Sequence, residues 1–379
     1  MQEAKSIKVH TAQTLESDPR AAVAELAQAL SCPNMAAVVF FCSIDYDLKE
    51  LAAALCETFT CPLVGCTTAG EIGPAGYRDH SITAFSIESK LLRVYPNLIS
   101  NVEECDSQTI EALASDVATE IGDARVELPG AMPFGFLLID GLTAKEEQVI
   151  GQLYHALGNV PIVGGSAAGG DSFKSTYVYY KGEFHTKAAT FSVFATTLPF
   201  EIFRTQHFIP SNTKLVITQA RPEERLVLEI NGKPAAQEYA RCLGLDKNNL
   251  TSEIFAMHPV MLKLGGEYYV RSVMQMLDDG TLKFACAIDE GLVLTIAEGV
   301  DMVENLRDSL EALQGRMHPQ VIIGCECFFR KIEVLEKDIK ESMGRIMKHH
   351  NVIGFHTYGE QINSVHVNQT FTGVAIGGE

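Results

Sequence analysis

The chain has 379 residues, 46% of them hydrophobic, which is enough for two or three domains with sizeable cores. Its formal net charge of −18, from 48 acidic and 30 basic residues, repels phosphate backbones and anionic lipid. Nucleic acid and membranes are therefore not expected partners. No signal peptide or membrane-spanning stretch is apparent, and the ten cysteines are scattered as reduced thiols usually are, so we expect a cytoplasmic protein.

One pattern of strand, helix, strand, glycine turn and alternating strand occurs three times along the chain. Copy one spans 36–43, 46–59, 62–73 and 81–89. Copy two spans 133–140, 144–158, 161–170 and 188–195. Copy three spans 319–326, 331–350, 351–362 and 370–378. Short apolar runs that alternate with helices predict β-α-β units, and the alternating strands add antiparallel pairs. The expected fold class is therefore α/β with mixed sheets.

The turn within each copy has two glycines in the spacing G-x-x-x-x-G after two apolar residues. The pairs are Gly65 and Gly70, Gly164 and Gly169, and Gly354 and Gly359. Glycine permits positive φ or a close approach to the backbone, and strand ends in α/β sheets often hold ligands. No Lys-Ser/Thr follows, so this is not a Walker motif. Both a ligand-binding turn and a plain strand-to-strand turn are consistent with this spacing.

A different region separates copies two and three. It is predicted to begin with a hairpin over 199–219, followed by a strand, an Asn-Gly turn and a helix that starts near Pro234. Several strands should cover 261–299, and a helix over 301–314 has Asp301 as its predicted N-cap. The domain boundary is expected near residue 225, where the sheet of copy two is complete.

Four segments resemble the FIST family in their order and spacing. They are VGCTTAGEIG (64–73), EINGKPAAQEYARCLG (229–244), RSVMQMLDDGTLKFACAIDEGLVLTIAEG (271–299) and VIGFHTYGEQ (352–361). The resemblance runs from about residue 20 to the C-terminus. It implies an N-terminal FIST domain over 1–224 with two copies of the repeat, and a C-terminal FIST domain over 225–379 with the third. It also implies sensory ligand binding linked to signalling proteins.

Within the family, the chain is similar to the NosP type in size and in its lack of fused domains. This resemblance implies haem b as cofactor, nitric oxide as ligand and a sensor histidine kinase as partner. The chain has no C-x-x-C-H motif, so covalent haem attachment is excluded. His356 lies in the third glycine turn, where the other copies have Thr67 and Ser166, and Phe355 and Tyr358 flank it as pocket walls. We therefore expect His356 to bind haem iron, with a hydrogen-bonded loop histidine as the alternative.

Two further residues could serve a haem site. His258 lies among Met257 and Met261, in a setting that suits either a haem slot or a core histidine. Arg271, on a predicted strand, could pair with a haem propionate, or with an acidic neighbour such as Glu267.

The second hypothesis is a FIST sensor of a small organic ligand such as an amino acid, without haem. The glycine turns would supply the binding residues: Gly65, Thr67, Gly70, Glu71, Gly354, Gly359 and Glu360. A third hypothesis is a pure interaction module. The sequence has no G-x-S-x-G, H-E-x-x-H or kinase signature, so we do not expect an enzyme. A homodimer is left open.

Overall fold

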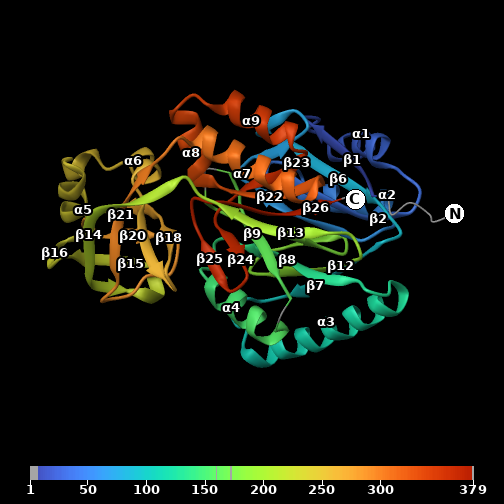
Figure 1. Ribbon diagram of the computed structural model, residues 1–379, viewed down its shortest axis with the longest axis horizontal. Helices are drawn as coiled ribbons and strands as arrows, with labels where there is room; N and C mark the ends of the chain where they lie inside the picture. The colour runs from blue at the N-terminus through green and yellow to red at the C-terminus, as the bar shows by residue number, and fades with distance from the viewer. Residues whose placement is uncertain (1–6, 159, 171–172, 378–379) are drawn as a thin grey trace.

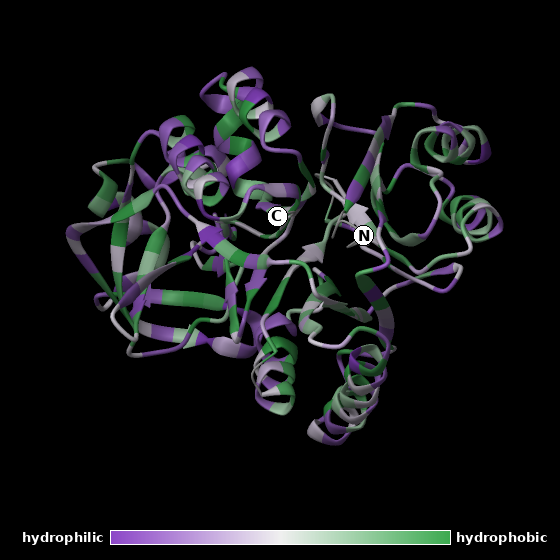
Figure 2. Ribbon diagram, turned by 45° about the vertical axis from the view of Figure 1, so that its right-hand side comes forward, coloured by the Kyte–Doolittle hydropathy of each residue, from purple (hydrophilic) through white to green (hydrophobic). Residues whose placement is uncertain are grey.

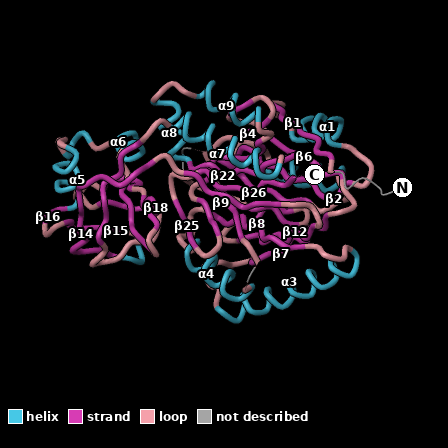
Figure 3. Tube along the Cα trace, in the orientation of Figure 1, coloured by secondary structure: helices cyan, strands magenta, loops and turns pink. Residues whose placement is uncertain are grey.

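The computed structural model describes residues 7–158, 160–170 and 173–377. With 30% helix and 41% strand in mixed sheets, it confirms the predicted fold class. The described strands form three six-stranded sheets and one eight-stranded sheet, and the eight-stranded sheet lies at one end of the long axis (Figures 1 and 3). No helix in the described ranges has the length and apolarity to cross a bilayer.

The three six-stranded sheets share one strand order. The sheet of copy one contains, in spatial order, β1 (Lys8–Thr14), β6 (Ile82–Glu88), β2 (Met35–Ser43), β3 (Leu63–Thr68), β10 (Val178–Tyr180) and β11 (Glu183–His185). The sheet of copy two contains β7 (Leu92–Ile99), β12 (Ala189–Thr196), β8 (Met132–Asp140), β9 (Ile162–Ala167), β24 (Glu360–Ile362) and β25 (Val365–Val367). The sheet of copy three contains β13 (Phe200–Thr205), β26 (Phe371–Gly377), β22 (Pro319–Cys327), β23 (Val352–Thr357), β4 (Glu71–Gly73) and β5 (Gly76–Arg78).

Each copy gives the hairpin after its glycine turn to a neighbouring sheet. Copy one gives β4 and β5 to copy three, copy two gives β10 and β11 to copy one, and copy three gives β24 and β25 to copy two. Within each sheet only the central pair is parallel: β2 with β3, β8 with β9, and β22 with β23. The exchange closes a ring, so the three copies form one body although residues 208–299 intervene in the chain.

The three sheets enclose a common apolar core, and helices cover their outer faces. Phe41 of copy one stacks on Phe355 of copy three with ring centroids 4.4 Å apart. The covering helices are α1 (Pro19–Leu30) and α2 (Leu48–Thr58) on copy one, α3 (Ser107–Glu127) and α4 (Glu146–Leu157) on copy two, and α7 (Met302–Met317), α8 (Phe328–Glu336) and α9 (Lys340–His349) on copy three. Asp301 caps α7 as predicted, accepting a 2.8 Å hydrogen bond from the Glu304 amide.

Two details of the predicted elements are wrong. The single helix expected over 331–350 is two helices, α8 and α9, because Asp338 between them has the left-handed φ of 52°. The hairpin expected over 199–219 does not form: β13 pairs with β26 in the copy-three sheet, whereas β14 (Phe208–Arg221) belongs to the eight-stranded sheet. His207, buried between these strands, is held on Glu333 of α8 and marks the change of sheet.

The eight-stranded sheet has its own core and two small helices. In spatial order it contains β18 (Glu267–Arg271), β17 (Val260–Leu264), β21 (Val293–Gly299), β14, β15 (Leu226–Ile230), β20 (Leu282–Phe284) and β19 (Val273–Met276), with β16 (Lys233–Pro234) on β15. The helices are α5 (Ala235–Leu243), with Pro234 at its N-cap, and α6 (Ser252–Met257). The strands of this sheet carry both hydrophobic and hydrophilic residues (Figure 2). Residue 225, near which the domain boundary was predicted, lies between β14 and β15, two neighbouring strands of this sheet.

Candidate functional site

The three glycine turns meet in a ring of backbone hydrogen bonds. Each turn donates an amide to the strand of another copy: Ala69 to the carbonyl of His356 at 3.0 Å, Ala168 to that of Thr67 at 2.9 Å, and Tyr358 to that of Ser166 at 3.4 Å. These donors are equivalent positions of the repeat, as are the acceptors. The strand ends of all three copies therefore converge on one point of the molecule.

The glycines of the motif serve close packing and turn geometry. A Cβ on Gly354 would lie 2.0 Å from the carbonyl oxygen of Gly324 on the parallel neighbour, and one on Gly164 would lie 1.9 Å from that of Leu137. Gly70 has a φ of 128°, which side-chain-bearing residues rarely adopt. The first glycine of each pair is thus explained by strand packing, and Gly70 by its turn.

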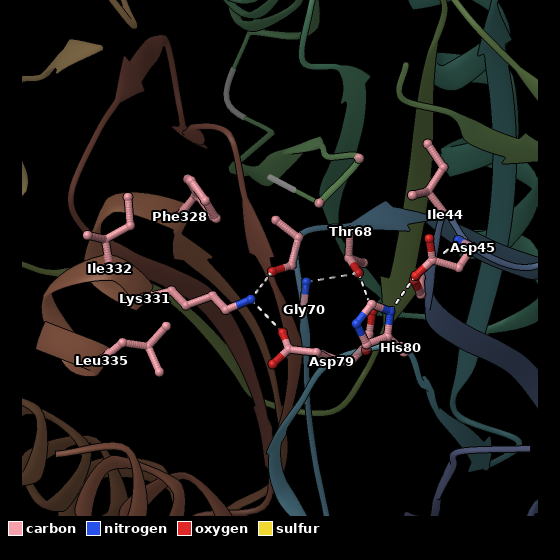
Figure 4. Close-up of a pocket in the computed structure, with 15 residues that line it drawn as sticks. Ile44, Asp45, Thr68, Gly70, Asp79, His80, Phe328, Lys331, Ile332 and Leu335 are labelled. Carbon is pink, nitrogen blue, oxygen red and sulfur yellow. Dashed lines mark hydrogen bonds and ion pairs between the residues drawn. The ribbon is translucent and has the colours of Figure 1, made fainter. Parts of the chain in front are cut away.

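A cavity of about 510 Å³ opens where the turns of copies one and two face α8 (Figure 4). We call it the axial cavity. Its lining residues are Ser43, Ile44, Asp45, Thr68, Ala69, Gly70, Glu71, Asp79, His80, Gly169, Gly170, Phe328, Lys331, Ile332 and Leu335. Apolar side chains of α8 form one wall, whereas most of the polar groups come from copy one.

Lys331 is the cation on the α8 wall of the axial cavity. Its Nζ donates to the carbonyl oxygen of Ala69 at 2.7 Å and to Oδ1 of Asp79 at 2.5 Å (Figure 4). The Lys331 side chain is 13% exposed and that of Asp79 is 41% exposed. Burial raises the pKa of Asp79, but the hydrogen bond and charge of Lys331 outweigh it, so the pKa is lowered overall. The pair links α8 to copy one.

A second pair of opposite charge, Asp45 and His80, lies on the other side of the cavity (Figure 4). Their mutual hydrogen bond is the main cause that lowers the pKa of Asp45 and raises that of His80. Ser43 also donates to Asp45, at 2.9 Å. Both side chains of the pair are more than half exposed, so their charge is available to a ligand at the cavity rim.

Glu71 lies at the base of the cavity and is fully buried. It accepts from the Ser81 amide at 3.1 Å, from the Ser81 hydroxyl at 2.6 Å, and from the Thr68 hydroxyl. Burial raises its pKa to about 7, against the lowering effect of these hydrogen bonds. The Glu71 carboxyl is therefore poised between neutral and charged forms near neutral pH.

Glu360 occupies the equivalent position in copy three but lies outside the axial cavity. It is buried and accepts from the Thr370 amide at 3.2 Å and the Thr370 hydroxyl at 2.7 Å, as Glu71 does from Ser81. Copy two has Gly170 and Ala188 at these two positions, and so lacks both the carboxyl and the hydroxyl. Glu71 and Glu360, both predicted as ligand-binding residues, therefore occupy separate, similar sites, and Glu71 alone of the two faces the cavity.

Of the other residues predicted for a small organic ligand, Gly70 lines the cavity. Thr67 is buried beside copy two, where its hydroxyl accepts from the Tyr177 amide at 2.9 Å. Gly65 and Gly354 lie within strands, and Gly359 packs against His366. The structure thus brings Gly70 and Glu71 together at the cavity and places the remaining five elsewhere.

His356, the predicted haem ligand, is buried with 1% exposure. Burial and the charges of Lys331, Lys340 and Arg330 lower its pKa well below the usual value, so the imidazole is neutral. Neither ring nitrogen has a hydrogen-bond partner among the described residues. Its donor chemistry therefore suits a metal, but the ring packs edge-on to Tyr77 at 4.8 Å and lies 3.9 Å from Glu326.

The other predicted haem residues do not share a cavity with His356. Phe355 points into the common core, Arg271 donates to the carbonyl oxygen of His366 at 3.1 Å, and His258 ends α6 with its pKa lowered by burial. Tyr358 lines a different cavity of about 450 Å³ between copy two and the eight-stranded sheet. A haem needs a slot beside its axial ligand. His356 lines neither this cavity nor the axial cavity, so the haem site stays a prediction.

The face of α8 away from the axial cavity carries a buried polar chain. Nε2 of His207 lies 2.9 Å from Oε2 of Glu333, and the other ring nitrogen accepts from Arg330 at 2.9 Å. Arg330 also donates to Glu326 at 3.1 Å. Because His207 immediately precedes β14, this chain joins α8 to the start of the eight-stranded sheet.

The sequence analysis did not identify Asp45, Asp79, His80, Phe328 or Lys331 as site residues. Phe328 directly follows the first strand of copy three, and Asp45 lies two residues after that of copy one. Parallel strands of one sheet end at the same edge, so the sequence could have predicted that these two residues lie near the glycine turns. Asp79 and His80 had no such signal, since the path of β4 and β5 into the copy-three sheet depends on the hairpin exchange.

Comparison with known proteins agrees with the repeat and the turns. The chain matches the FIST N domain over residues 36–233 and the FIST C domain over residues 235–363. It is 26% identical over 356 residues to a protein of Methanocaldococcus jannaschii described as uncharacterized, with 82% of this chain and 67% of that protein covered. FIST domains are sensor domains of signal transduction. The chain belongs to the FIST family.

Proposed function

We propose that this FIST protein senses a small zwitterionic ligand of the amino-acid class, bound in the axial cavity. The observation that carries the proposal is the cavity itself: about 510 Å³ where the repeat's strand ends converge, with Lys331 facing the carboxyl groups of Asp45, Asp79 and Glu71. A mainly preformed cavity with a few convergent polar groups is the usual form of a small-molecule site.

The charges suggest an orientation for the ligand. A lysine ammonium has three donors, and Ala69 and Asp79 take two from Lys331, which leaves one for a ligand carboxylate. Asp45 and Glu71, on the copy-one side, would accept from the ligand's ammonium group. Ile332 and Leu335 would contact an apolar side chain.

The signal would pass through α8. Lys331, Ile332 and Leu335 face the axial cavity, whereas Arg330 and Glu333 face His207 at the start of the eight-stranded sheet. A ligand that draws Lys331 away from Asp79 would bias the position of α8, and with it the eight-stranded sheet. A partner protein would read that change as a shift between two populated arrangements. A sensor histidine kinase is the partner class that the family resemblance implies.

A thermal-shift screen with millimolar amino acids tests the proposal, because a ligand of the native state raises the apparent stability. Matched amines without the carboxylate and acids without the amine should stabilise the protein less than the parent amino acid. A screen in which no zwitterion raises Tm, or in which the deaminated acids work equally well, would contradict it.

Haem binding with nitric-oxide sensing is the competing proposal from the NosP resemblance. Haemin titration separates the two by absorbance. A stoichiometric Soret band that is lost in His356→Ala and shifts with nitric oxide would support the haem proposal over ours. We expect no stoichiometric complex, because His356 lines neither of the two cavities described above.

A further inference from the structure

A cluster of metal-binding side chains lies far from the axial cavity, on the copy-one sheet. His10, Cys32 and Glu88 each offer one ligand atom, and the three atoms lie within 4.8 Å of one another. No other such group of three occurs within 7–158, 160–170 and 173–377. The strand β1 that carries His10 lies at the opposite end of the long axis from the eight-stranded sheet (Figure 1).

The fold brings these residues together from three segments of copy one. On the antiparallel pair β1 and β6, His10 pairs with Ser86 and Lys8 pairs with Glu88, so His10 and Glu88 are diagonal neighbours on one face. Cys32 follows the C-cap of α1 at Ser31, where the chain turns back toward β2. The end of α1 thus carries the thiol onto the face that holds the imidazole and the carboxylate.

Distances within the cluster suit a small ion. Nε2 of His10 lies 3.3 Å from Oε2 of Glu88. Two ligands bound at ~2.0–2.1 Å with a tetrahedral angle lie about 3.3 Å apart, so this pair already has the spacing of a tetrahedral edge. Cys32 Sγ lies 3.8 Å from the Ser86 hydroxyl, which itself donates to the carbonyl oxygen of Leu30 at 2.6 Å.

We propose that His10, Cys32 and Glu88 form a binding site for a thiophilic divalent cation of the Zn²⁺ class, with its fourth position open to water. Imidazole, thiolate and carboxylate are the three ligand types that Zn²⁺ takes in proteins, and three protein ligands leave one open position. Mg²⁺ and Ca²⁺ require oxygen ligands and do not suit a thiol. All three side chains are partly exposed, which gives the ion a path of entry.

Bound metal would tie the edge strand β1 to the end of α1 and to β6. Because β1 is the outermost strand of its sheet and, among the described strands, pairs only with β6, a metal bridge there would reinforce its attachment to the sheet. The ion binds the folded arrangement and not the separated segments, so it stabilises copy one. This site works independently of the axial cavity.

Co²⁺ titration of the chelator-stripped full chain tests the site, since a thiolate ligand gives an intense charge-transfer absorption with Co²⁺. We expect one equivalent to bind with that absorption, Zn²⁺ to displace it, and Zn²⁺ but not Mg²⁺ to raise Tm. Cys32→Ser should abolish the thiolate absorption, and His10→Ala should weaken Zn²⁺ binding about 100-fold or more, since even the loss of an outer-shell partner costs 10–100-fold.

Cys56→Ser is the matched control, because Cys56 is an exposed free thiol on α2 outside the cluster. It should keep the wild-type absorption and affinity. Circular dichroism of the metal-free variants verifies that they fold. Absence of saturable one-equivalent binding in the wild type would overturn the proposal. So would a thiolate signal that survives Cys32→Ser, or Zn²⁺ binding that is unchanged in His10→Ala.

Discussion

Nζ of Lys331 lies 2.5 Å from Oδ1 of Asp79, so an ion pair in the lining of the axial cavity links α8 to copy one. In the proposed function, the ligand carboxylate must share Lys331 with this aspartate. Asp79 is then a competitor of the ligand, and the pair holds α8 in its ligand-free position.

Asp79→Asn should therefore increase ligand affinity. A partly exposed ion pair contributes ~0.4–1 kcal/mol, and releasing Lys331 from it corresponds to a two- to fivefold lower Kd. Calorimetric titration of wild type and variant with the best amino acid from the screen measures the change. Weaker binding in the variant would mean that Asp79 instead binds the ligand's ammonium group.

Glu71→Gln should change how stability depends on pH. The pKa of Glu71 is raised to about 7 by burial, from 4.5 for the free side chain. Between these values the folded state keeps a proton that the unfolded state has lost, so Glu71 makes the protein less stable as pH rises through this window. The glutamine side chain does not ionise, so the variant should not lose this stability. The difference in the free energy of unfolding should reach up to about 3 kcal/mol above pH 7.

Urea unfolding at pH 5 and pH 8 checks this, with Glu111→Gln on the exposed face of α3 as control. The Glu71 variant should gain stability relative to wild type at pH 8 more than at pH 5, whereas the control should follow wild type. Equal pH dependence of all three proteins would show that Glu71 ionises normally.

Glu333→Ala should destabilise the protein by about 1–3 kcal/mol, because it leaves the buried Nε2 of His207 without its hydrogen-bond partner. Burial lowers the pKa of His207 more than Glu333 raises it, so the neutral imidazole would lose its acceptor. Glu336→Ala, at an exposed position of the same helix, should shift the urea midpoint little. Similar urea midpoints for the two variants would show that the buried hydrogen bonds of His207 do not stabilise the contact between α8 and β14.

Gly354→Ala should destabilise copy three, because its Cβ would lie 2.0 Å from the Gly324 carbonyl oxygen on the adjacent strand. Overpacking of this kind costs ~1–3 kcal/mol or more. Gly122→Ala on α3 meets no atom within 4 Å and should stabilise by up to about 1 kcal/mol. Thermal unfolding compares them, and a neutral Gly354→Ala would remove the close-packing explanation of the motif.

Local sequence patterns predicted much of the fold. The strand and helix of each copy, the glycine turns and the cap at Asp301 follow from apolar periodicity and residue type, and the structure has them within a few residues. The break at Asp338 could not be predicted this way, since it is one aspartate in left-handed geometry inside an amphipathic pattern. The ring of exchanged hairpins also depends on pairing between distant segments, which periodicity does not encode.

In the candidate site, too, local patterns predicted some residues, whereas others depend on contacts between distant segments. Gly70 and Glu71 were predicted because they belong to the repeated turn, and they do line the axial cavity. Lys331 and Asp79 reach it from other segments, and their meeting follows from the ring closure. His356 was selected as an unusual residue in the turn, but strand alternation and packing place its ring against Tyr77 and outside the axial cavity.

The most direct test of the central claim is calorimetric titration of wild type, Lys331→Met and Lys340→Met with a stabilising amino acid. Lys340 also faces Asp79, at 3.7 Å, but lies outside the axial cavity. We predict one site per chain in the wild type and in Lys340→Met, and at least tenfold weaker binding in Lys331→Met. Equal binding by all three proteins, or no binding of any amino acid to the wild type, would contradict the assignment of the axial cavity as the ligand site.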